Sequence, residues 1–282
     1  MTYRRASRSN SIAMARQGTL IISVKVGSGR LVMEPSLAEA ERHRPAGPSQ
    51  PEEQEARVEM GSARFRLRAA CGLAGPVAFT AAWVAGTLRQ AGYSVAEEHL
   101  SGLAAPDARN PEIMIAGFLA LGACTFAFAS ALEEALGGRG RAGLGPVLMR
   151  AAGIGTVAAG LLRRDRMLLH PPGGVTGQSW HNHGHDLASG VLYASLLVAP
   201  LLLARRFRGD PEWEVLRPPA VATTIGSATL LGLFWSDTMA QWGGVIQRVI
   251  ATVPLGMMAA LAVKLLSRDP QAVGPATRRT AR

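Results

Sequence analysis

Residues 113–132 have the sequence IMIAGFLALGACTFAFASAL, a run of 20 residues without a charged side chain. A helix needs roughly 20 apolar residues to cross the hydrocarbon core of a bilayer. In that solvent each backbone amide and carbonyl needs an internal partner, and an α-helix supplies one. The stretch therefore predicts a transmembrane helix and an all-α, polytopic membrane protein.

Five further runs have the composition of membrane spans. They cover residues 69–88, 144–162, 187–204, 219–235 and 242–263. The third and sixth spans along the chain contain Arg150 and Arg248, respectively. Each is long enough once its arginine reaches water or a partner. We therefore predict a bundle of six transmembrane helices within a membrane domain of residues 67–266.

The basic residues flanking these runs predict an orientation. They include Arg64, Arg66 and Arg68 before the first span, Arg139 and Arg141 after the second, Arg205, Arg206 and Arg208 after the fourth, and Lys264 and Arg268 after the sixth. Because basic connecting segments stay on the cytoplasmic side, both ends of the chain are expected in the cytoplasm, with the protein in the plasma membrane. If 144–162 were not a span, the basic clusters would fall on both faces.

The two terminal segments differ from this membrane domain. Residues 1–66 are basic, polar and without an apolar period, which predicts a disordered tail, and residues 267–282 form a basic cytoplasmic tail. Met60 lies just before the first span, so a gene starting there would encode the same membrane domain. The net charge of +10 comes mostly from clusters beside apolar runs rather than from one helix face, which argues against a nucleic-acid partner.

The outer loops collect histidine and acidic residues, most densely in WHNHGHD at 180–186. If this piece is extended, His181, His183 and His185 point to one side; if it is helical, His181 and His185 share a face. Imidazole suits zinc and related divalent metals. A three-ligand site with an open position would activate a bound water.

The alternative for WHNHGHD is a solvated helix start at the membrane surface. Asp186 would be favourable there, near the positive end of the helix dipole, and it is also a candidate ligand-binding residue. Spacing alone does not establish the geometry of a metal site. Both interpretations stay open at this point.

Arg248 lies within the last span, where a cation needs a partner or water. Asp165 ends the third span and Asp237 ends the fifth, so either carboxylate is a candidate to pair with it. The alternative to a structural ion pair is that Arg248 binds an anionic group. In an enzyme, Asp165 or Asp237 would act as a base or an additional metal ligand.

His99, Ser101 and Asp107 lie together in the first outer loop and superficially resemble a catalytic set. A triad is defined by geometry rather than by membership, and serine and histidine on one loop usually take part in turns and caps. We therefore keep His99 and Ser101 as candidate ligand-binding residues rather than catalytic ones.

Several short motifs resemble those of the membrane family called domain of unknown function 998. They are HLS at 99–101, the glycine-rich third span closing with Asp165, HD at 185–186, RRF at 205–207, and Trp242, Gly243, Gln247 and Arg248. The resemblance covers about residues 70–266 and implies a six-helix bundle without an established activity. Arg163 and Arg164 depart from the more apolar approach to Asp165 that we associate with the family.

Two function classes fit these observations. The first is a non-enzymatic lipid-binding, sensing or transport-related bundle, in which outer polar residues contact anionic lipid headgroups. The second is a metal-dependent hydrolase that acts on a lipid or amide at the outer leaflet, with the three histidines as ligands. Metal content would separate them.

Overall fold

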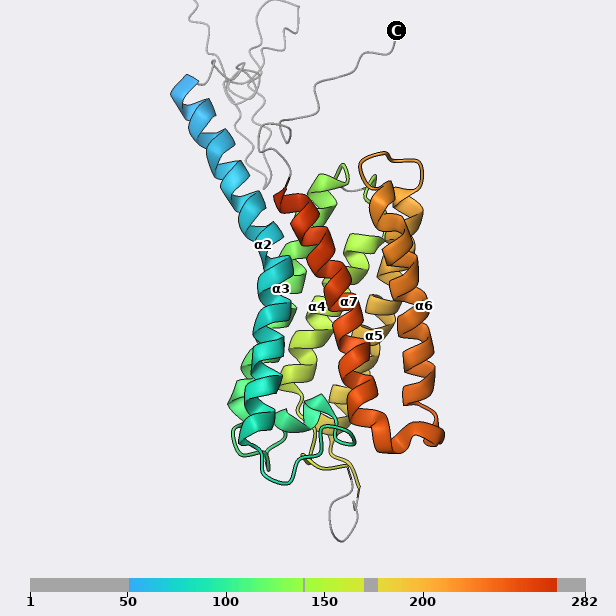
Figure 1. The fold of residues 1–282 in the computed structure, drawn as a ribbon. Coiled ribbons are helices and arrows are strands. Elements are labelled where there is room, and N and C mark those ends of the chain that lie inside the picture. The colour runs from blue at the N-terminus through green and yellow to red at the C-terminus, as the bar shows by residue number, and fades with distance from the viewer. Residues whose placement is uncertain (1–50, 139, 170–176, 268–282) are drawn as a thin grey trace, which may run out of the picture. The chain divides into compact units, whose positions relative to one another are not determined.

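The helices of the computed structural model alternate in direction along the chain (Figure 1). The structure describes residues 51–138, 140–169 and 177–267, without the side chains of 51–58, 237, 238 and 240. Within these residues it is all-α, as predicted. The α-helices are α2 (Pro51–Arg89), α3 (Pro111–Ala135), α4 (Gly145–Leu161), α5 (Trp180–Phe207), α6 (Arg217–Phe234) and α7 (Gly243–Leu266).

Three short 3-10 helices mark the two ends of the bundle. Between α2 and α3 lies η1 (Leu100–Ala104), and between α6 and α7 lies η3 (Asp237–Trp242). The connection from α5 to α6 contains η2 (Glu214–Leu216). Because the helices alternate, η1 and η3 lie at one end, here called the η1 end, and η2 lies at the other, the η2 end. The η1 end is at the bottom of Figure 1.

Four helices are long and apolar enough to cross a membrane. They cover Glu59–Arg89, Pro111–Ala135, Trp180–Phe207 and Gly243–Leu266. The apolar helix α4 is shorter, with 17 residues, and α6 begins with one arginine and two prolines. The four long helices are those of a membrane protein with several spans, while the predicted count of six exceeds what length and composition alone support.

The first helix begins earlier than predicted. α2 starts at Pro51, inside the segment expected to be a disordered tail, and continues through the sequence EEQEAR. Proline suits the first turn of a helix, and glutamate, glutamine, alanine and arginine are good helix formers. Residues 1–50 and 268–282, the remainder of the predicted tails, lie outside the described residues.

Glycines set the spacing of α3, α4 and α5. A β-carbon on Gly122 of α3 would lie 2.6 Å from the carbonyl oxygen of Gly153 on α4. One on Gly155 would lie 2.9 Å from the carbonyl oxygen of Ala188 on α5. No hydrophobic effect drives helices together in lipid, so close backbone approach supplies much of the packing energy.

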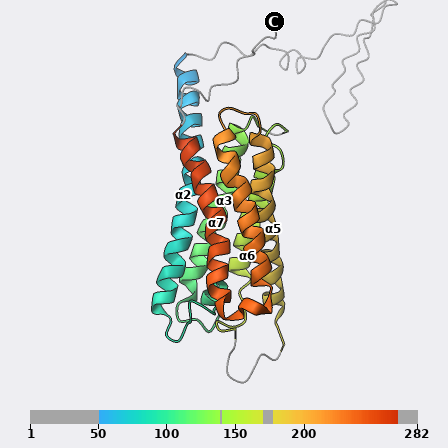
Figure 2. The ribbon, with the colours of Figure 1, turned by 45° about the vertical axis from the view of Figure 1, so that its right-hand side comes forward.

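The last helix closes the bundle against the first. α7 runs beside α6 and approaches α2 (Figure 2). A β-carbon on Gly72 of α2 would lie 2.7 Å from the β-carbon of Ala262 on α7. Among the described residues, the buried side chains that carry a charge or an imidazole are Glu98, His185 and Arg248. All three lie in the half of the bundle nearer the η1 end.

Candidate functional site

Arg248 is buried near the start of α7, with 7% of its surface exposed. Its Nη1 donates to the carbonyl oxygens of Val95, Glu98 and Gly244, at 2.9, 3.1 and 2.8 Å. Its Nη2 donates to the hydroxyl of Tyr93 at 2.8 Å. Burial raises the pKa of Tyr93, and the nearby guanidinium opposes that shift. The described contacts of Arg248 thus hold the segment after α2 in place.

The same segment caps the start of α7. The backbone amides of Gly244 and Val245 donate to the carbonyl oxygen of Ala96, at 2.8 and 3.2 Å. A β-carbon on Gly244 would lie 2.5 Å from the carbonyl oxygens of Val95 and Glu98. Glycine is therefore required for this close approach, which satisfies amides that a helix start leaves without a partner.

Asp165 lies beside the start of α5. The backbone amide of Ser179 donates to its Oδ2 at 2.7 Å, and the Ser179 hydroxyl donates to its Oδ1. The hydroxyl bond, followed by the amide bond, lowers the pKa of Asp165. Ser179 is also the N-cap of α5 and accepts from the backbone amide of Asn182 at 3.3 Å. Among the described ion pairs none joins Asp165 to Arg248, and the side chain of Asp237 is outside the described set.

The three histidines of WHNHGHD face different surroundings. His181 is exposed and stacks on Trp180, with ring centroids 3.7 Å apart. His183 is also exposed, whereas His185 is turned into the bundle and only 3% exposed. α5 already begins at Trp180, so successive side chains rotate by about 100° instead of alternating.

The helix turns His183 to another side, whereas His181 and His185 lie one turn apart on the same side but differ in burial, with His181 at the exposed start of α5 and His185 inside the bundle. Within the described residues, no group of three or more histidine, cysteine, aspartate or glutamate side chains is arranged to hold a metal ion. The imidazoles that a strand would have placed on one side are divided between solvent and the bundle interior.

His185 has a defined orientation inside the bundle. Its Nδ1 lies 2.8 Å from the carbonyl oxygen of Ala159 on α4. Because a carbonyl oxygen only accepts, the hydrogen-bond pattern assigns the proton to Nδ1 and leaves a lone pair on Nε2. The hydroxyl of Ser189, one turn later on α5, lies 3.3 Å from that Nε2 and donates to it. His185 and Ser189 are therefore an oriented pair.

This pair lines a cavity of about 40 Å³ within the bundle. The polar side chains around it are Ser101, Thr156, His185, Ser189, Tyr193 and Gln247. A water molecule needs about 10–15 Å³ of such space, so the cavity has room for a few waters or a small polar group. Neither Glu98 nor Arg248 lines it, which leaves the lining without a charged side chain.

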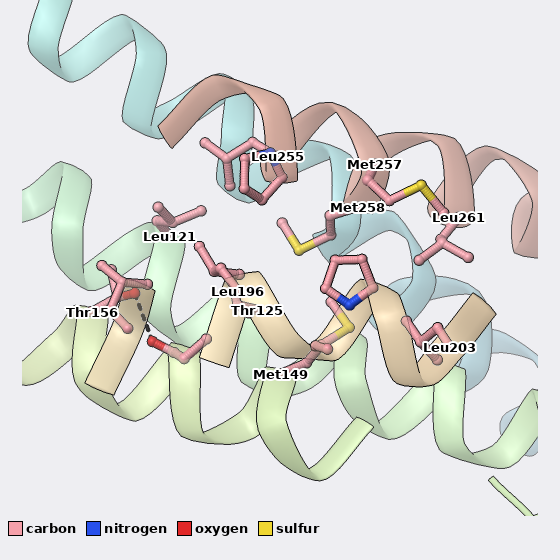
Figure 3. Close-up of a pocket in the computed structure, with 15 residues that line it drawn as sticks. Leu121, Thr125, Met149, Thr156, Leu196, Leu203, Leu255, Met257, Met258 and Leu261 are labelled. Atoms are coloured by element: carbon pink, nitrogen blue, oxygen red, sulfur yellow. Dashed lines mark hydrogen bonds between the residues drawn. The ribbon is translucent and has the colours of Figure 1, made fainter. Parts of the chain in front are cut away.

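A second cavity, of about 30 Å³, continues the first toward the η2 end. The two share five lining residues, Leu121, Thr156, Leu192, Leu196 and Leu255. Figure 3 shows Met149, Met258 and Leu261 around the second cavity. The polar side chains in its lining are Thr125 and Thr156, and the hydroxyl of Thr156 donates to the carbonyl oxygen of Ala152 in its own helix at 2.7 Å, so the lining is mostly apolar.

The other predicted ligand-binding residues are placed differently. Ser101, in η1, is 4% exposed and lines the first cavity. His99 lies outside that lining, with its Nδ1 2.8 Å from Nη1 of Arg164. Asp186 is exposed and accepts from the side-chain amide of Asn182 at 3.1 Å. Of the predicted residues whose side chains the structure describes, Ser101 and His185 are the two that line this first cavity.

No site role was predicted for several residues of this region, although Gln247 belongs to the motif near Arg248. Gln247 lines the cavity, and its Oε1 accepts from the backbone amide of Leu100 at 2.6 Å. Glu98 is 5% exposed and accepts from the backbone amide of Leu169 at 2.7 Å. Tyr193 and Gln247 lie within long apolar runs, and polar residues inside a span are a signal of function that would have found them.

Together these features define a class: an α-helical membrane protein whose bundle encloses a largely apolar space with neutral polar side chains gathered toward the η1 end. The family model described as "Protein of unknown function (DUF998)" matches residues 73–264. The chain belongs to this family, as the motifs between HLS and the last span predicted. Neither the curated proteins nor the solved structures that were compared give a match.

Proposed function

We propose that the protein crosses the bacterial plasma membrane six times, with both ends in the cytoplasm and the η1 end outside, and binds a single-chain amphiphile in its interior. The alternating basic segments support this orientation. α4 packs between α3 and α5, and α6 between α5 and α7, so both accompany long apolar helices. The 17 residues of α4 span about 26 Å, which local thinning of the bilayer accommodates.

The observation that carries the proposed ligand is the continuity of the two cavities. The first is lined by apolar side chains with several neutral hydrogen-bonding groups among them, and the second by apolar side chains and two threonines. An amphiphile with an uncharged polar head and one hydrocarbon chain matches these two linings, with its head in the first cavity and its chain in the second. Ligand-binding sites commonly place a few polar groups within an apolar lining. A charged head would lose its hydration without gaining a charged partner in the cavity lining.

The apolar cavity has adaptable walls. Met149, Met257 and Met258 line it, and methionine fills irregular space with three rotatable bonds. Because the open volumes are about 30 and 40 Å³, a hydrocarbon chain enters only when these side chains rotate away and yield their space. Outside the cavities, the exposed side chain of Arg166 at the η1 end would attract the anionic headgroups of the bilayer.

Photocrosslinking tests the binding proposal. Purified protein in mild detergent is incubated with a monoacylglycerol whose chain carries a diazirine and an alkyne, irradiated, and digested for mass spectrometry. We expect crosslinks on cavity-lining residues of α4, α5 and α7. Native mass spectrometry of the protein as purified should also show a retained single-chain lipid.

A matched pair of variants makes the test specific. Leu196→Trp fills the junction of the two cavities, whereas Val198→Trp adds the same ring on the exposed face of α5. Crosslinking should fall about tenfold or more in the first, as the loss of ~1.4 kcal/mol of binding would produce, and stay unchanged in the second. Equal crosslinking of both variants, or crosslinks confined to the lipid-facing surface, would overturn the proposal.

A further inference from the structure

We infer that the oriented pair of Ser189 and His185 is an acyl-transfer site for the ester of a single-chain amphiphile. Ser189 is the nucleophile and His185 is its general base. The inference rests on the proposed function, because the substrate is a member of the same ligand class. It differs from a metal-dependent hydrolase in that the nucleophile is a side chain of this protein.

The first argument is the relation of nucleophile, base and orienting group. A serine hydroxyl is activated when a base accepts its proton and a third group orients that base. Here the Ser189 hydroxyl lies 3.3 Å from Nε2 of His185, and the carbonyl oxygen of Ala159 holds the opposite nitrogen at 2.8 Å. Such hydrogen bonds are commonly longer before substrate binds. A backbone carbonyl takes the place that a carboxylate has in other triads.

The second argument is the rigidity of the base. His185 is 3% exposed and packs at the contact of α4 with α5, where Gly155 brings the two backbones close. The ring of Phe118 on α3 stands edge-on to the imidazole, with centroids 6.4 Å apart. The imidazole is therefore held from two neighbouring helices, and a fixed base costs little reorganisation during reaction.

The third argument is the position of the pair relative to free space. Ser189 and His185 both line the cavity of about 40 Å³ rather than a filled core. The adjoining apolar cavity leads away from the pair toward the η2 end, so a hydrocarbon chain lying there would direct its ester group to Ser189. The remaining polar space has room for the water that completes the reaction.

Donors for a developing oxyanion line the same cavity. The Oε1 of Gln247 accepts from the amide of Leu100, so its Nε2 is the donor of that side chain, and it also hydrogen-bonds with the hydroxyl of Tyr193. The hydroxyls of Ser101 and Tyr193 lie in the same lining. Donors that face the charge formed in the transition state contribute a large share of catalysis in acyl transfer.

The reaction balances without a metal or a redox partner. The Ser189 oxygen attacks the ester carbonyl carbon while its proton passes to Nε2 of His185. The bond from that carbon to the alcohol oxygen breaks, and the alcohol leaves with the proton from Nε2. Water then gives a proton to Nε2 and attacks the acyl-serine, which releases the fatty acid as Ser189 recovers its proton. The net change is hydrolysis of one ester to an acid and an alcohol.

The test uses hexadecyl fluorophosphonate, which reacts covalently with activated serines. The full chain in mild detergent is treated with this probe, and the modified residue is identified by mass spectrometry. We expect modification of Ser189. Labelling should fall about a hundredfold or more in Ser189→Ala and in His185→Gln, in keeping with the usual contribution of a general base. It should also decline at acidic pH, where an imidazole base is protonated.

Ser195→Ala is the matched control. Ser195 is buried on the same helix but lines neither cavity, so this variant should react like the wild type. Because the modified residue is identified in the wild-type protein, the result does not depend on whether each variant folds. Wild-type protein that crosslinks the diazirine probe yet leaves Ser189 unmodified would overturn the acyl-transfer site and leave amphiphile binding intact. Failure of both probes would overturn both, and equal reaction of His185→Gln would remove the role of His185 as base.

Discussion

The Nη2 of Arg248 donates a 2.8 Å hydrogen bond to the hydroxyl of Tyr93. This bond joins the start of α7 to the segment that follows α2, and the Tyr93 hydroxyl in turn donates to the carbonyl oxygen of His99 at 2.9 Å. The intramembrane arginine thus organises backbone at the η1 end. It does so beside the cavity rather than within its lining.

Replacing Arg248 should destabilise the bundle. Arg248→Met leaves the carbonyl oxygens of Val95 and Glu98 without their guanidinium donor, so we expect the free energy of unfolding to fall by about 3 kcal/mol. Tyr93→Phe removes one hydroxyl and should cost about 1 kcal/mol. Thermal unfolding in detergent measures both. The exposed Arg205→Met serves as a control, and a melting temperature of Arg248→Met equal to that of the control would contradict this account.

Two glycines of α7 should respond in opposite directions to alanine. In Gly244→Ala the new β-carbon would lie 2.5 Å from two carbonyl oxygens, so the loop must move and stability should fall by about 1–3 kcal/mol. Gly256 has no atom within 4 Å of such a β-carbon, and Gly256→Ala should be neutral or stabilising by up to about 1 kcal/mol. If the melting temperatures of the two variants shift in the same direction by the same amount, the start of α7 is not packed as described.

The Asp165 carboxylate should give stability a weak dependence on pH. Its pKa is lowered in the folded state by the hydroxyl and then the amide of Ser179. A carboxyl with a lowered folded pKa stabilises the protein above its ordinary value of 3.8 and loses that effect as the pH falls through the lowered value. The effect should be under about 1 kcal/mol because the site is largely open to solvent.

The comparison of wild type with Asp165→Asn isolates this contribution. The wild type should melt at the higher temperature at pH 7, and the difference should shrink below about pH 4. Melting curves from pH 3 to pH 7 in one detergent measure it, and other titrating groups cancel in the difference. A difference that stays constant over this range would show that the Ser179 contacts do not favour the ionised carboxyl.

Single cysteines should report the orientation. In a background without Cys71 and Cys124, Pro106→Cys and Gln178→Cys should react with a membrane-impermeant maleimide on intact cells. Leu144→Cys and Pro211→Cys should react only after permeabilisation, since the proposed topology of six spans places them inside. Labelling of Pro106→Cys without Gln178→Cys would mean that α4 does not cross the membrane.

The positions of the helices could largely be predicted, because the transfer of apolar side chains into lipid depends on each residue by itself. The uncharged run 113–132 lies within α3, and 187–204 lies within α5. Each residue of such a run contributes to burial in lipid through its own side chain, so a sum along the chain locates the helices. The early start of α2 was missed because its first residues are polar, and a hydropathy sum along the chain does not detect a polar helix outside an apolar run.

The candidate site could be predicted only in part. The sequence pointed to His185 and Ser101, and both line the cavity. It also grouped His181 and His183 with His185. In the helix that begins at Trp180, His183 is rotated away from the face that carries His185, while His181 lies one turn before His185 at the exposed start of α5. Asp165 was expected beside Arg248, and in the structure it caps α5 through Ser179. The partners of these side chains include backbone groups, and sequence patterns do not give the positions of backbone groups.

By itself the sequence determined that this is a helical membrane protein and roughly where its helices run, because the solvation of a side chain depends on its own chemistry. The tertiary structure decided which polar groups meet. Arg248 reaches Tyr93 across 155 residues of chain, and Gln247 reaches Leu100 across 147. Such contacts depend on the rotation of each helix about its axis and on the path of the loops, which packing between distant segments sets.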